Sequence, residues 1–249
     1  MLSVQHPRCA VTDDVRAPFG LSAVIRCFAL GVLLLLAGCA TSGDPYEPFN
    51  RGVLKFNDAA DSAVLKPIAG GYRAVVPAFA QAGLSNFLGN LQEPWTSVNQ
   101  LLQGKPGLFA SDLARFVVNT TVGVAGLFDV ATAAGLEKHR EDFGQTLAVW
   151  GVPPGPFLMV PFWGPSTARD GIGDIAGIYG WPPSYFDSRA ARNVTAALWI
   201  IKTRSDYLGA ERLLQGDRYL FLRDAFLQNR AYRINDGQIV DDPFLSEVL

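Results

Sequence analysis

Hydrophobic residues recur at helical spacing along most of the chain. Phe49, Val53 and Phe56 fall at steps of four and three, which predicts a helix that begins at Glu47 and ends at Pro67. Further helices are predicted within 78–103, where a new helix starts at Glu93-Pro94 and ends at Gly104. Others are predicted from Pro106 onward, over 189–203 and over 216–234. No alternation of polar and apolar residues is long enough to predict a sheet. The chain is therefore expected to form one irregular, all-α domain over residues 47–235.

Two segments of this domain carry almost no charge. Residues 121–136 contain one charged side chain, Asp129, and are predicted to form a bent helical hairpin. Residues 143–168 contain no charged side chain, but prolines and glycines interrupt them throughout. This second segment is apolar enough to contact a membrane and too broken to cross one as a helix. We expect it to fold as a hairpin, with Ser166 capping the helix that follows.

The N-terminal residues have the features of a bacterial lipoprotein signal. Arg26 precedes a short apolar run, and Leu36-Ala37-Gly38-Cys39 follows as a lipobox. Residues 1–38 are therefore predicted to be a signal peptide, with Cys39 as the lipidated first residue of the mature chain. A plain secretory signal with a chance cysteine is the alternative. The leader is unusually long, so its true start is expected near residues 21–26.

Composition narrows the function. Charged residues make up 18% of the chain, below the usual 25% or so, and the formal net charge is −2. Removing the signal peptide takes away three arginines and two aspartates, so the mature chain stays acidic, which argues against a nucleic-acid partner. It also removes Cys9 and Cys27, so no internal disulfide and no thiolate metal site is expected. Residues 39–46 are predicted to be a tether and residues 236–249 a loose tail.

Residue types that support catalysis are scarce. His139 is the one histidine of the mature chain and lies in the charged turn "EKHRED", where a solvated side chain is the alternative to a general base. Asp170 and Asp174 are four residues apart on a predicted helix, and an exposed helix face is the alternative to a catalytic pair. No nucleophile elbow, dinucleotide fingerprint or metal-binding motif occurs. We therefore predict no enzyme, no cofactor and no metal site.

Contact with a membrane is the interpretation that the apolar segments favour. Trp150, Trp163 and Trp181 are residues that suit a membrane interface, where one end of the ring is dry and the other wet. A core rich in aromatic residues is the alternative for each tryptophan by itself. Because two uncharged segments occur on a chain with a predicted lipid anchor, we expect them to lie at a membrane surface.

Five blocks in order resemble the MlaA (VacJ) family of outer-membrane lipoproteins. They are "DPYEPFNRGVLKFNDAAD", "KPIAGGYRAVVP", "LSNFLGNLQEPWTSVNQLLQGK", "ARFVVNTTVGVAGLFDVA" and "EDFGQTLAVWGVPPGPFLMVPFWGPSTARD". The resemblance covers residues 44–177 and is weaker over 178–249. It implies an all-helical ring in the periplasmic leaflet of the outer membrane, with a central amphipathic channel. It also implies that phospholipid leaves the outer leaflet through this channel and passes to an MlaC-like periplasmic carrier. This transport keeps the outer membrane asymmetric, and in several members of the family the protein sits beside a trimeric porin.

The matching blocks supply candidate residues for these roles. Candidates for the channel lining and lipid contact are Asn50, Arg51, Asn57, Asn86, Asn90, Asn99, Asn119, Thr120 and Gln145. For each of them, capping a helix or satisfying backbone groups is the alternative. Candidates for a membrane-anchoring or gating hairpin are Trp150, Phe157, Phe162 and Trp163. Two rival functions remain open: a structural envelope lipoprotein that moves no lipid, and a lipid-modifying enzyme.

Overall fold

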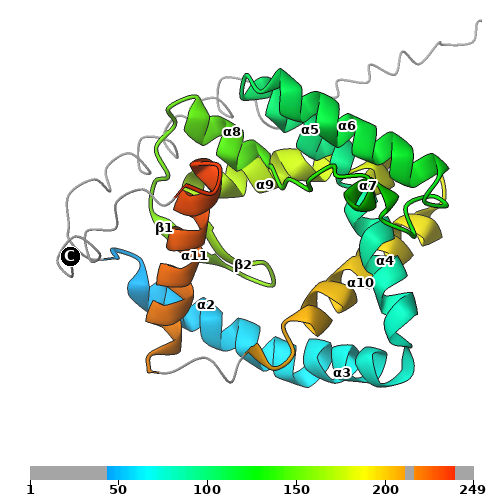
Figure 1. Ribbon diagram of the computed structural model, residues 1–249. Coiled ribbons are helices and arrows are strands. Elements are labelled where there is room, and N and C mark those ends of the chain that lie inside the picture. The colour runs from blue at the N-terminus through cyan, green and yellow to red at the C-terminus, as the bar shows by residue number, and fades with distance from the viewer. Residues whose placement is uncertain (1–43, 211–215, 239–249) are drawn as a thin grey trace, which may run out of the picture. The chain divides into compact units, whose positions relative to one another are not determined.

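The computed structural model describes residues 44–210 and 216–238. The signal peptide, Cys39 and residues 239–249 of the expected tail lie outside these ranges. The described residues are mostly helical, as expected, and Figure 1 shows their arrangement. The helices are α2 (Glu47–Ala60), α3 (Lys66–Val75), α4 (Ala78–Asn90), α5 (Glu93–Leu102), α6 (Pro106–Thr121), α7 (Val130–Ala133), α8 (Phe143–Val149), α9 (Ala168–Gly180), α10 (Arg189–Asp206) and α11 (Arg218–Ile234). None of the described helices combines the length and hydropathy needed to span a bilayer.

The first helical stretch does not end at Pro67, which corrects the sequence prediction. A π-helical stretch, η1 (Asp61–Leu65), joins α2 directly to α3, and Pro67 lies in the first turn of α3. Because Pro67 has no backbone N–H to donate, a continuous helix loses one bond here, and the irregular hydrogen bonding of η1 just before it is where the helix adapts. The stretch ends instead at Val76, which is extended (φ −84°, ψ 123°). Pro77 follows it, and the residue before a proline is disfavoured in the α conformation.

Contacts between the elements form a closed circuit within this part of the chain. The neighbours in order are α3 with α10, α10 with α4, α4 with α6, α6 with α5, α5 with α8, α8 with α9, α9 with β2, and the β1–β2 pair with α2 and α11. The circuit closes because α2 and α3 both contact η1, which joins them. Figure 1 shows these elements following one another around an open centre. Prolines and glycines set the helix boundaries and keep the helices short. The chain can therefore change direction often.

The segment 143–168 contains a small sheet that the sequence pattern did not predict. Strands β1 (Phe157–Val160) and β2 (Gly164–Thr167) pair antiparallel, with Phe157 opposite Thr167 and Val160 opposite Gly164. Ser166 lies in β2, so the cap of α9 is one residue later: the Thr167 hydroxyl accepts from the backbone nitrogen of Asp170 at 3.2 Å. Neither FLMV in β1 nor GPST in β2 alternates apolar and polar residues, so the strands gave no signal in the sequence.

The segment 121–136 is also different from the prediction. It is a run of turns followed by the four-residue helix α7, and not a helical hairpin. Val124 and Ala125 have positive φ values of 54° and 57°, a conformation that ends regular helix. Gly126 adopts φ 86° close to Asn90, where a Cβ would lie only 2.6 Å from the Asn90 side chain. The glycines therefore serve a tight turn against α4.

Candidate functional site

Polar side chains dominate the interior of the described part of the chain. Its buried hydrophobic side chains are few: Leu54, Ala69, Leu88, Ala131, Phe157, Met159 and Tyr219. Nineteen polar or charged residues are buried beside them, including Arg115, Arg169, Arg230, Glu93, Asp112 and Asp170. Charged residues are rarely buried in proteins that fold in water unless they are paired. The interior is therefore held together mainly by hydrogen bonds and ion pairs.

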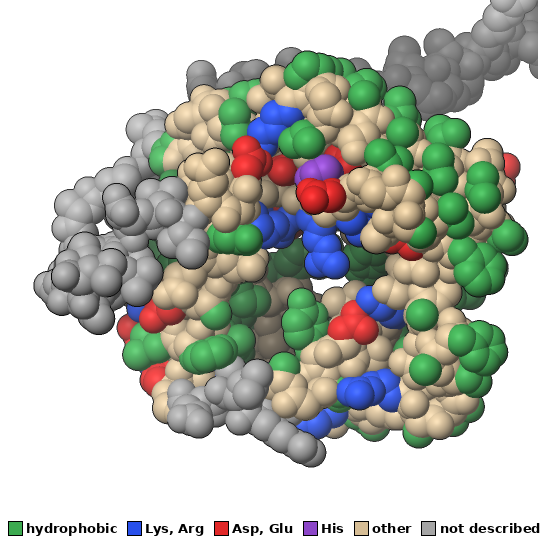
Figure 2. All heavy atoms as spheres, viewed as in Figure 1, with side chains coloured by type: hydrophobic (Ala, Val, Ile, Leu, Met, Phe, Trp, Pro, Cys, Tyr) green, Lys and Arg blue, Asp and Glu red, His purple; other side chains and the backbone are tan. Residues whose placement is uncertain are grey.

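The surface shows the opposite pattern. Large hydrophobic side chains are exposed on nearly every described helix, and several are more than half exposed, such as Val75, Phe79 and Ile175; Phe128, in the turns before α7, is also more than half exposed. Figure 2 shows many hydrophobic side chains along the outer edge of the view, and lysine and arginine side chains, with some acidic and hydrophobic ones, around the opening in the middle. Exposed apolar area on this scale marks a surface that contacts another apolar phase or a partner.

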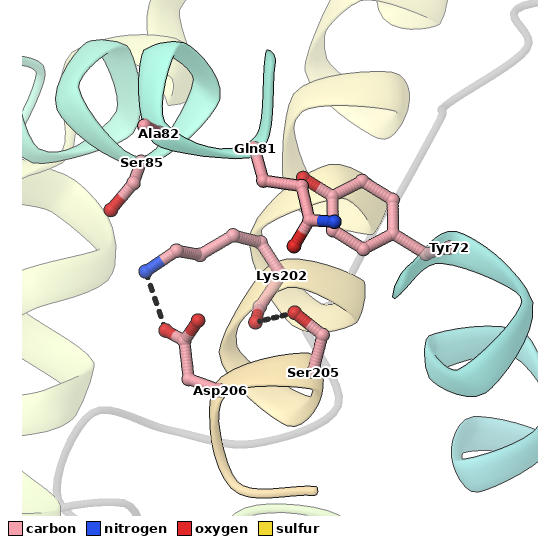
Figure 3. Close-up of a pocket in the computed structure, with 7 residues that line it drawn as sticks. All are labelled: Tyr72, Gln81, Ala82, Ser85, Lys202, Ser205 and Asp206. Carbon is pink, nitrogen blue, oxygen red and sulfur yellow. Dashed lines mark hydrogen bonds and ion pairs between the residues drawn. The ribbon is translucent and has the colours of Figure 1, made fainter. Parts of the chain in front are cut away.

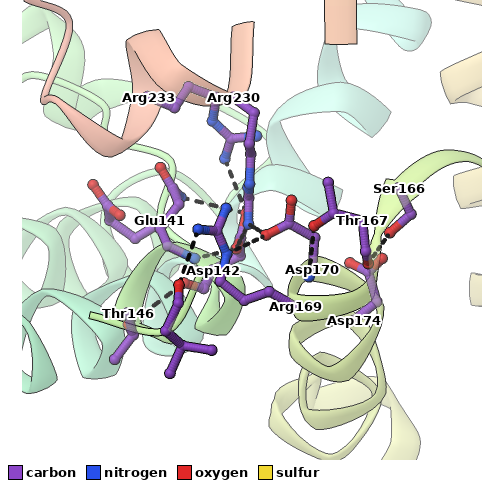
Figure 4. A network of polar contacts seen from close by, with 12 residues as sticks. Glu141, Asp142, Thr146, Ser166, Thr167, Arg169, Asp170, Asp174, Arg230 and Arg233 are labelled. Carbon is purple, nitrogen blue, oxygen red and sulfur yellow. Dashed lines mark hydrogen bonds and ion pairs between the residues drawn. The ribbon is translucent and has the colours of Figure 1, made fainter. Parts of the chain in front are cut away.

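An arginine network joins α11, the last helix of the described residues, to the N-termini of α8 and α9 (Figure 4). Arg230 of α11 donates to both carboxylate oxygens of Asp142 at 2.6 Å and to Asp170 Oδ1 at 2.8 Å. Asp142 also caps α8, because its Oδ1 accepts from the backbone nitrogen of Gln145 at 3.0 Å. Arg169 donates to Asp170 at 3.1 Å from within α9. Three helices that are distant in sequence thus meet at one buried charge cluster.

The electrostatics of this cluster favour the ionised forms. Burial by itself would raise the pKa of Asp142, but the hydrogen bonds and the charge of Arg230, with the charge of Arg233, outweigh burial and lower that pKa. Burial would likewise lower the pKa of Arg230, and its bonds to Asp142 and Asp170 raise it instead. Asp142 and Arg230 therefore stay charged at neutral pH and hold α11 in place.

Gly144 and Gly173 allow α8 and α9 to approach closely at this cluster. A Cβ on Gly173 would lie 2.3 Å from the backbone nitrogen of Gly144 and 2.7 Å from its Cα. A Cβ on Gly144 would lie 2.3 Å from the Arg230 guanidinium. Only a residue without a side chain fits at either position, so the geometry of the cluster depends on both glycines.

A second buried cluster surrounds Arg115 of α6. Its guanidinium donates to Glu93 at 3.4 Å, to the Asp129 carboxylate at 3.2 and 3.3 Å and to Thr132 at 3.1 Å, and also bonds the Leu136 carbonyl. Burial raises the pKa of Glu93, while the charges of Lys138 and Arg115 act in the opposite direction without cancelling the rise. This cluster fixes the turns of residues 122–136 against α5 and α6.

Two asparagines of α2 hold the β1–β2 hairpin. Asn50 Nδ2 donates to the Phe157 carbonyl at 3.1 Å, and its Oδ1 accepts from the backbone nitrogen of Met159 at 2.8 Å. Asn57 repeats this pattern at the turn, with bonds of 3.0 Å to the Val160 carbonyl and 2.8 Å from the Phe162 nitrogen. Each side-chain amide thus replaces a missing strand partner, which is the backbone-satisfying alternative considered for these residues.

The predicted channel residues divide by burial. Five of them are buried and hydrogen-bonded within the fold, so their side chains do not face an open surface: Asn50, Asn90, Asn99, Asn119 and Gln145. The other four are partly or fully exposed: Arg51, Asn57, Asn86 and Thr120. The structure therefore assigns the buried group to bracing the fold, and lipid contact remains a prediction for the exposed group.

The predicted hairpin aromatics also divide. Phe162 is 76% exposed, Trp163 62% and Trp150 53%, as an anchoring role requires. Phe157 is 7% exposed and packs edge-on against the rings of Tyr219 and Phe226. Its predicted place on the membrane surface is therefore wrong, because the pleat of β1 turns this side chain into the small hydrophobic core.

The candidate catalytic groups have structural partners. His139 Nδ1 lies 2.8 Å from Asp112 Oδ1, beside the Arg115 cluster. Asp170 belongs to the Arg230 network, and Asp174 accepts from the Trp163 indole nitrogen at 3.0 Å. Within residues 44–210 and 216–238, no group of His, Cys, Asp and Glu side chains has the arrangement of a metal site. Sequence reasoning missed Arg115 and Arg230, since an arginine on an amphipathic helix gives no local sign that it is buried.

Three comparisons with known proteins indicate the same family. A family model described as MlaA lipoprotein matches residues 42–233. The intermembrane phospholipid transport system lipoprotein MlaA of Escherichia coli (strain K12) is 37% identical over 238 residues, covering 86% of this chain and 90% of the relative. The protein of the same name from Haemophilus influenzae is 30% identical over 228 residues, covering 86% and 91%. A solved structure described as "Structural basis for maintenance of bacterial outer membrane lipid asymmetry" superposes with a TM-score of 0.69 at 35% identity, covering 78% of this chain and all of the other.

Proposed function

Since this chain belongs to the MlaA lipoprotein family, we propose that it removes mislocalised phospholipid from the outer leaflet of the outer membrane. In this proposal, Cys39 carries the lipid anchor, the helical domain lies in the periplasmic leaflet, and an MlaC-like periplasmic carrier receives the lipid. The result is maintenance of lipid asymmetry. Relatives named as parts of an intermembrane phospholipid transport system support this proposal.

The observation that carries the proposal is the reversed distribution of polar and apolar side chains. Exposed apolar side chains such as Phe79, Phe128 and Ile175 suit contact with acyl chains, whereas ion pairs such as Arg230–Asp142 fill the interior. Ionisable residues at membrane depth are expected to face the protein interior or a polar cavity and to pair with each other. A protein that worked only in the aqueous periplasm would leave this apolar surface without a partner.

Lipid passage is limited by the head group, because a polar group without a partner in hydrocarbon costs several kcal/mol. In this proposal the opening in Figure 2 serves as the channel, and the charged side chains that border it lower that cost. Meanwhile the acyl chains stay against apolar side chains, so no step in the passage requires covalent chemistry. A trimeric porin beside the apolar surface is a further part of this proposal.

The first test measures phospholipid in the outer leaflet of cells that lack this protein. We expect surface phospholipid to rise on deletion, to fall when the wild-type gene returns, and to stay high with a Cys39→Ala copy. An unchanged leaflet after deletion would overturn the transport proposal and favour the structural envelope lipoprotein. Full restoration by Cys39→Ala would leave transport in place and reject the lipid anchor.

A further inference from the structure

A cavity of about 220 Å³ lies where α3, α4 and α10 meet (Figure 3). Its lining is mostly polar: Tyr72 comes from α3, Gln81 and Ser85 from α4, and Lys202, Ser205 and Asp206 from α10. The volume is below the roughly 300–1,000 Å³ of pockets that enclose drug-sized ligands, so it fits a small polar group and not a whole lipid.

Opposite charges lie side by side in this cavity. Lys202 Nζ is 2.5 Å from Asp206 Oδ2, and the lysine side chain is 22% exposed while the aspartate is 51% exposed. The bond to Asp206 uses one of the three ammonium donors of Lys202, and it engages Oδ2 of the Asp206 carboxylate, which has a second oxygen. The cavity therefore offers donors and an acceptor of opposite charge next to each other.

The other polar groups of the cavity are only partly satisfied. The Tyr72 hydroxyl is shielded from solvent and has no hydrogen-bond partner. The Gln81 amide nitrogen donates to the Val76 carbonyl at 2.7 Å, and the Ser205 hydroxyl donates to the Lys202 carbonyl at 2.7 Å. Burial, followed by the negative charge of Asp206, raises the pKa of Tyr72, so its hydroxyl stays a donor at neutral pH. A shielded hydroxyl without a partner calls for a ligand or a water molecule.

Exposed apolar side chains adjoin these polar groups. Val75 is three residues from Tyr72 on α3 and 81% exposed, and Phe79 is three residues from Ala82 on α4 and 80% exposed. Residues three apart lie on the same face of a helix. Tyr207, 62% exposed, directly follows Asp206. Polar cavity and apolar surface are thus neighbours, which is the arrangement that an amphipathic ligand needs.

We propose that this cavity binds the zwitterionic head group of a phospholipid, with the phosphodiester at Lys202 and Tyr72 and the ammonium at Asp206. The inference rests on the proposed function, and it adds a preference for head groups that carry both charges. A charge pair on the protein matches a charge pair on the ligand only when both ligand charges are present. Lys202 binds the phosphate as a point charge, and the carboxylate of Asp206 accepts from the ammonium.

The test measures binding to the purified full-length lipoprotein in detergent micelles. The probes are phosphatidylethanolamine, phosphatidylglycerol, the acyl-free glycerophosphoethanolamine and inorganic phosphate. We expect tighter binding of phosphatidylethanolamine than of phosphatidylglycerol by the wild type. Lys202→Gln should weaken the binding of both lipids about tenfold, because it removes a charge-assisted hydrogen bond that is partly shielded from water. Asp206→Asn should weaken only phosphatidylethanolamine and so abolish the preference.

The matched control is the pair Arg223 and Asp224 on α11, whose side chains are 24% and 51% exposed. Arg223→Gln and Asp224→Asn should leave binding unchanged. The double exchange Lys202→Asp with Asp206→Lys keeps an ion pair at this site but reverses it, so it should fold and lose the preference.

Three results would overturn the inference. If the Lys202 and Asp206 variants bind both lipids as the wild type does, the cavity is only a crevice between helices and the transport proposal is unaffected. If inorganic phosphate competes as well as glycerophosphoethanolamine, the site takes phosphate and not a lipid head group. If the wild type binds no phospholipid, the inference and the proposed function fail together.

Discussion

Arg230 and Asp142 form a bidentate ion pair across 88 residues of sequence, with both nitrogen–oxygen distances at 2.6 Å. The pair joins the last described helix to the capping residue of α8, and Asp170 of α9 shares the same guanidinium. Parallel double bonds of this kind combine charge with a fixed geometry. The cluster therefore determines where α11 lies on the rest of the domain.

Arg230→Met is expected to lower the free energy of unfolding by about 3–5 kcal/mol, because it leaves two shielded carboxylates without their cation. Equilibrium denaturation in detergent, followed by circular dichroism, measures the loss. The matched control is Arg223→Met on the same helix, whose exposed pair with Asp224 should change stability by less than about 1 kcal/mol. Equal losses for the two variants would contradict this view of the cluster.

Gly173→Ala is expected to prevent the close approach of α8 and α9, since its Cβ would lie 2.3 Å from the Gly144 nitrogen. Gly171→Ala, two residues earlier in the same helix, meets no atom nearer than 3.9 Å. This control should be neutral or should stabilise the fold by up to about 1 kcal/mol through helix propensity. Thermal unfolding measures the stability of both variants. A Gly173→Ala protein as stable as Gly171→Ala would refute the need for close contact between α8 and α9 at this position.

The pKa of Asp129 is expected near 2. Burial raises it, but hydrogen bonds from Thr132 and Asn119, together with the charge of Arg115, lower it to about 2, against about 3.9 in the unfolded chain. Because the folded pKa is the lower one, Asp129 stabilises the fold at neutral pH, and this contribution is lost as the pH falls from about 4 to about 2. Asn119→Ala should raise the pKa, as an NMR titration of the carboxyl carbon measures; no change would rule out this cause.

Asn57→Ala is expected to loosen the turn of the hairpin, because it removes both bonds to Val160 and Phe162. Phe162 has a positive φ of 61°, a conformation that costs a bulky residue energy and that these bonds help to hold. Amide hydrogen exchange of residues 160–164 should quicken by tenfold or more. Asn86→Ala, which removes a single bond to the Leu127 carbonyl, is the control and should leave this segment unchanged.

The exposed hairpin aromatics are expected to contact lipid. A photo-crosslinking residue in place of Phe162 or Trp163 should label phospholipid in membranes, since these side chains are 76% and 62% exposed. The same residue at Phe157, five positions before Phe162 and buried, should label only this protein. Crosslinks from Phe162 and Trp163 to soluble protein alone would reject membrane contact for the hairpin.

Local signals in the sequence determined most of the helices. The starts at Glu93 and Pro106 and the two late helices, α10 and α11, lie where spacing, proline and glycine placed them. These signals act within one or two turns of the chain, so they are visible without the fold. The prediction from Pro67 was wrong. A proline ends a helix unless the preceding turn adapts to the missing N–H, and here the π-helical stretch η1 adapts.

The sequence by itself also determined the family, the scarcity of catalytic groups and the excess of apolar residues. Only the tertiary structure decided where the polar residues lie: Asn50 and Gln145 brace the fold, and Arg115 and Arg230 are buried in ion clusters. The physical reason is that their partners come from elements far along the chain, as Asp142 does for Arg230 at 88 residues. Spacing along one helix cannot show whether a polar face meets water, lipid or another helix, because that depends on which elements the fold brings against it.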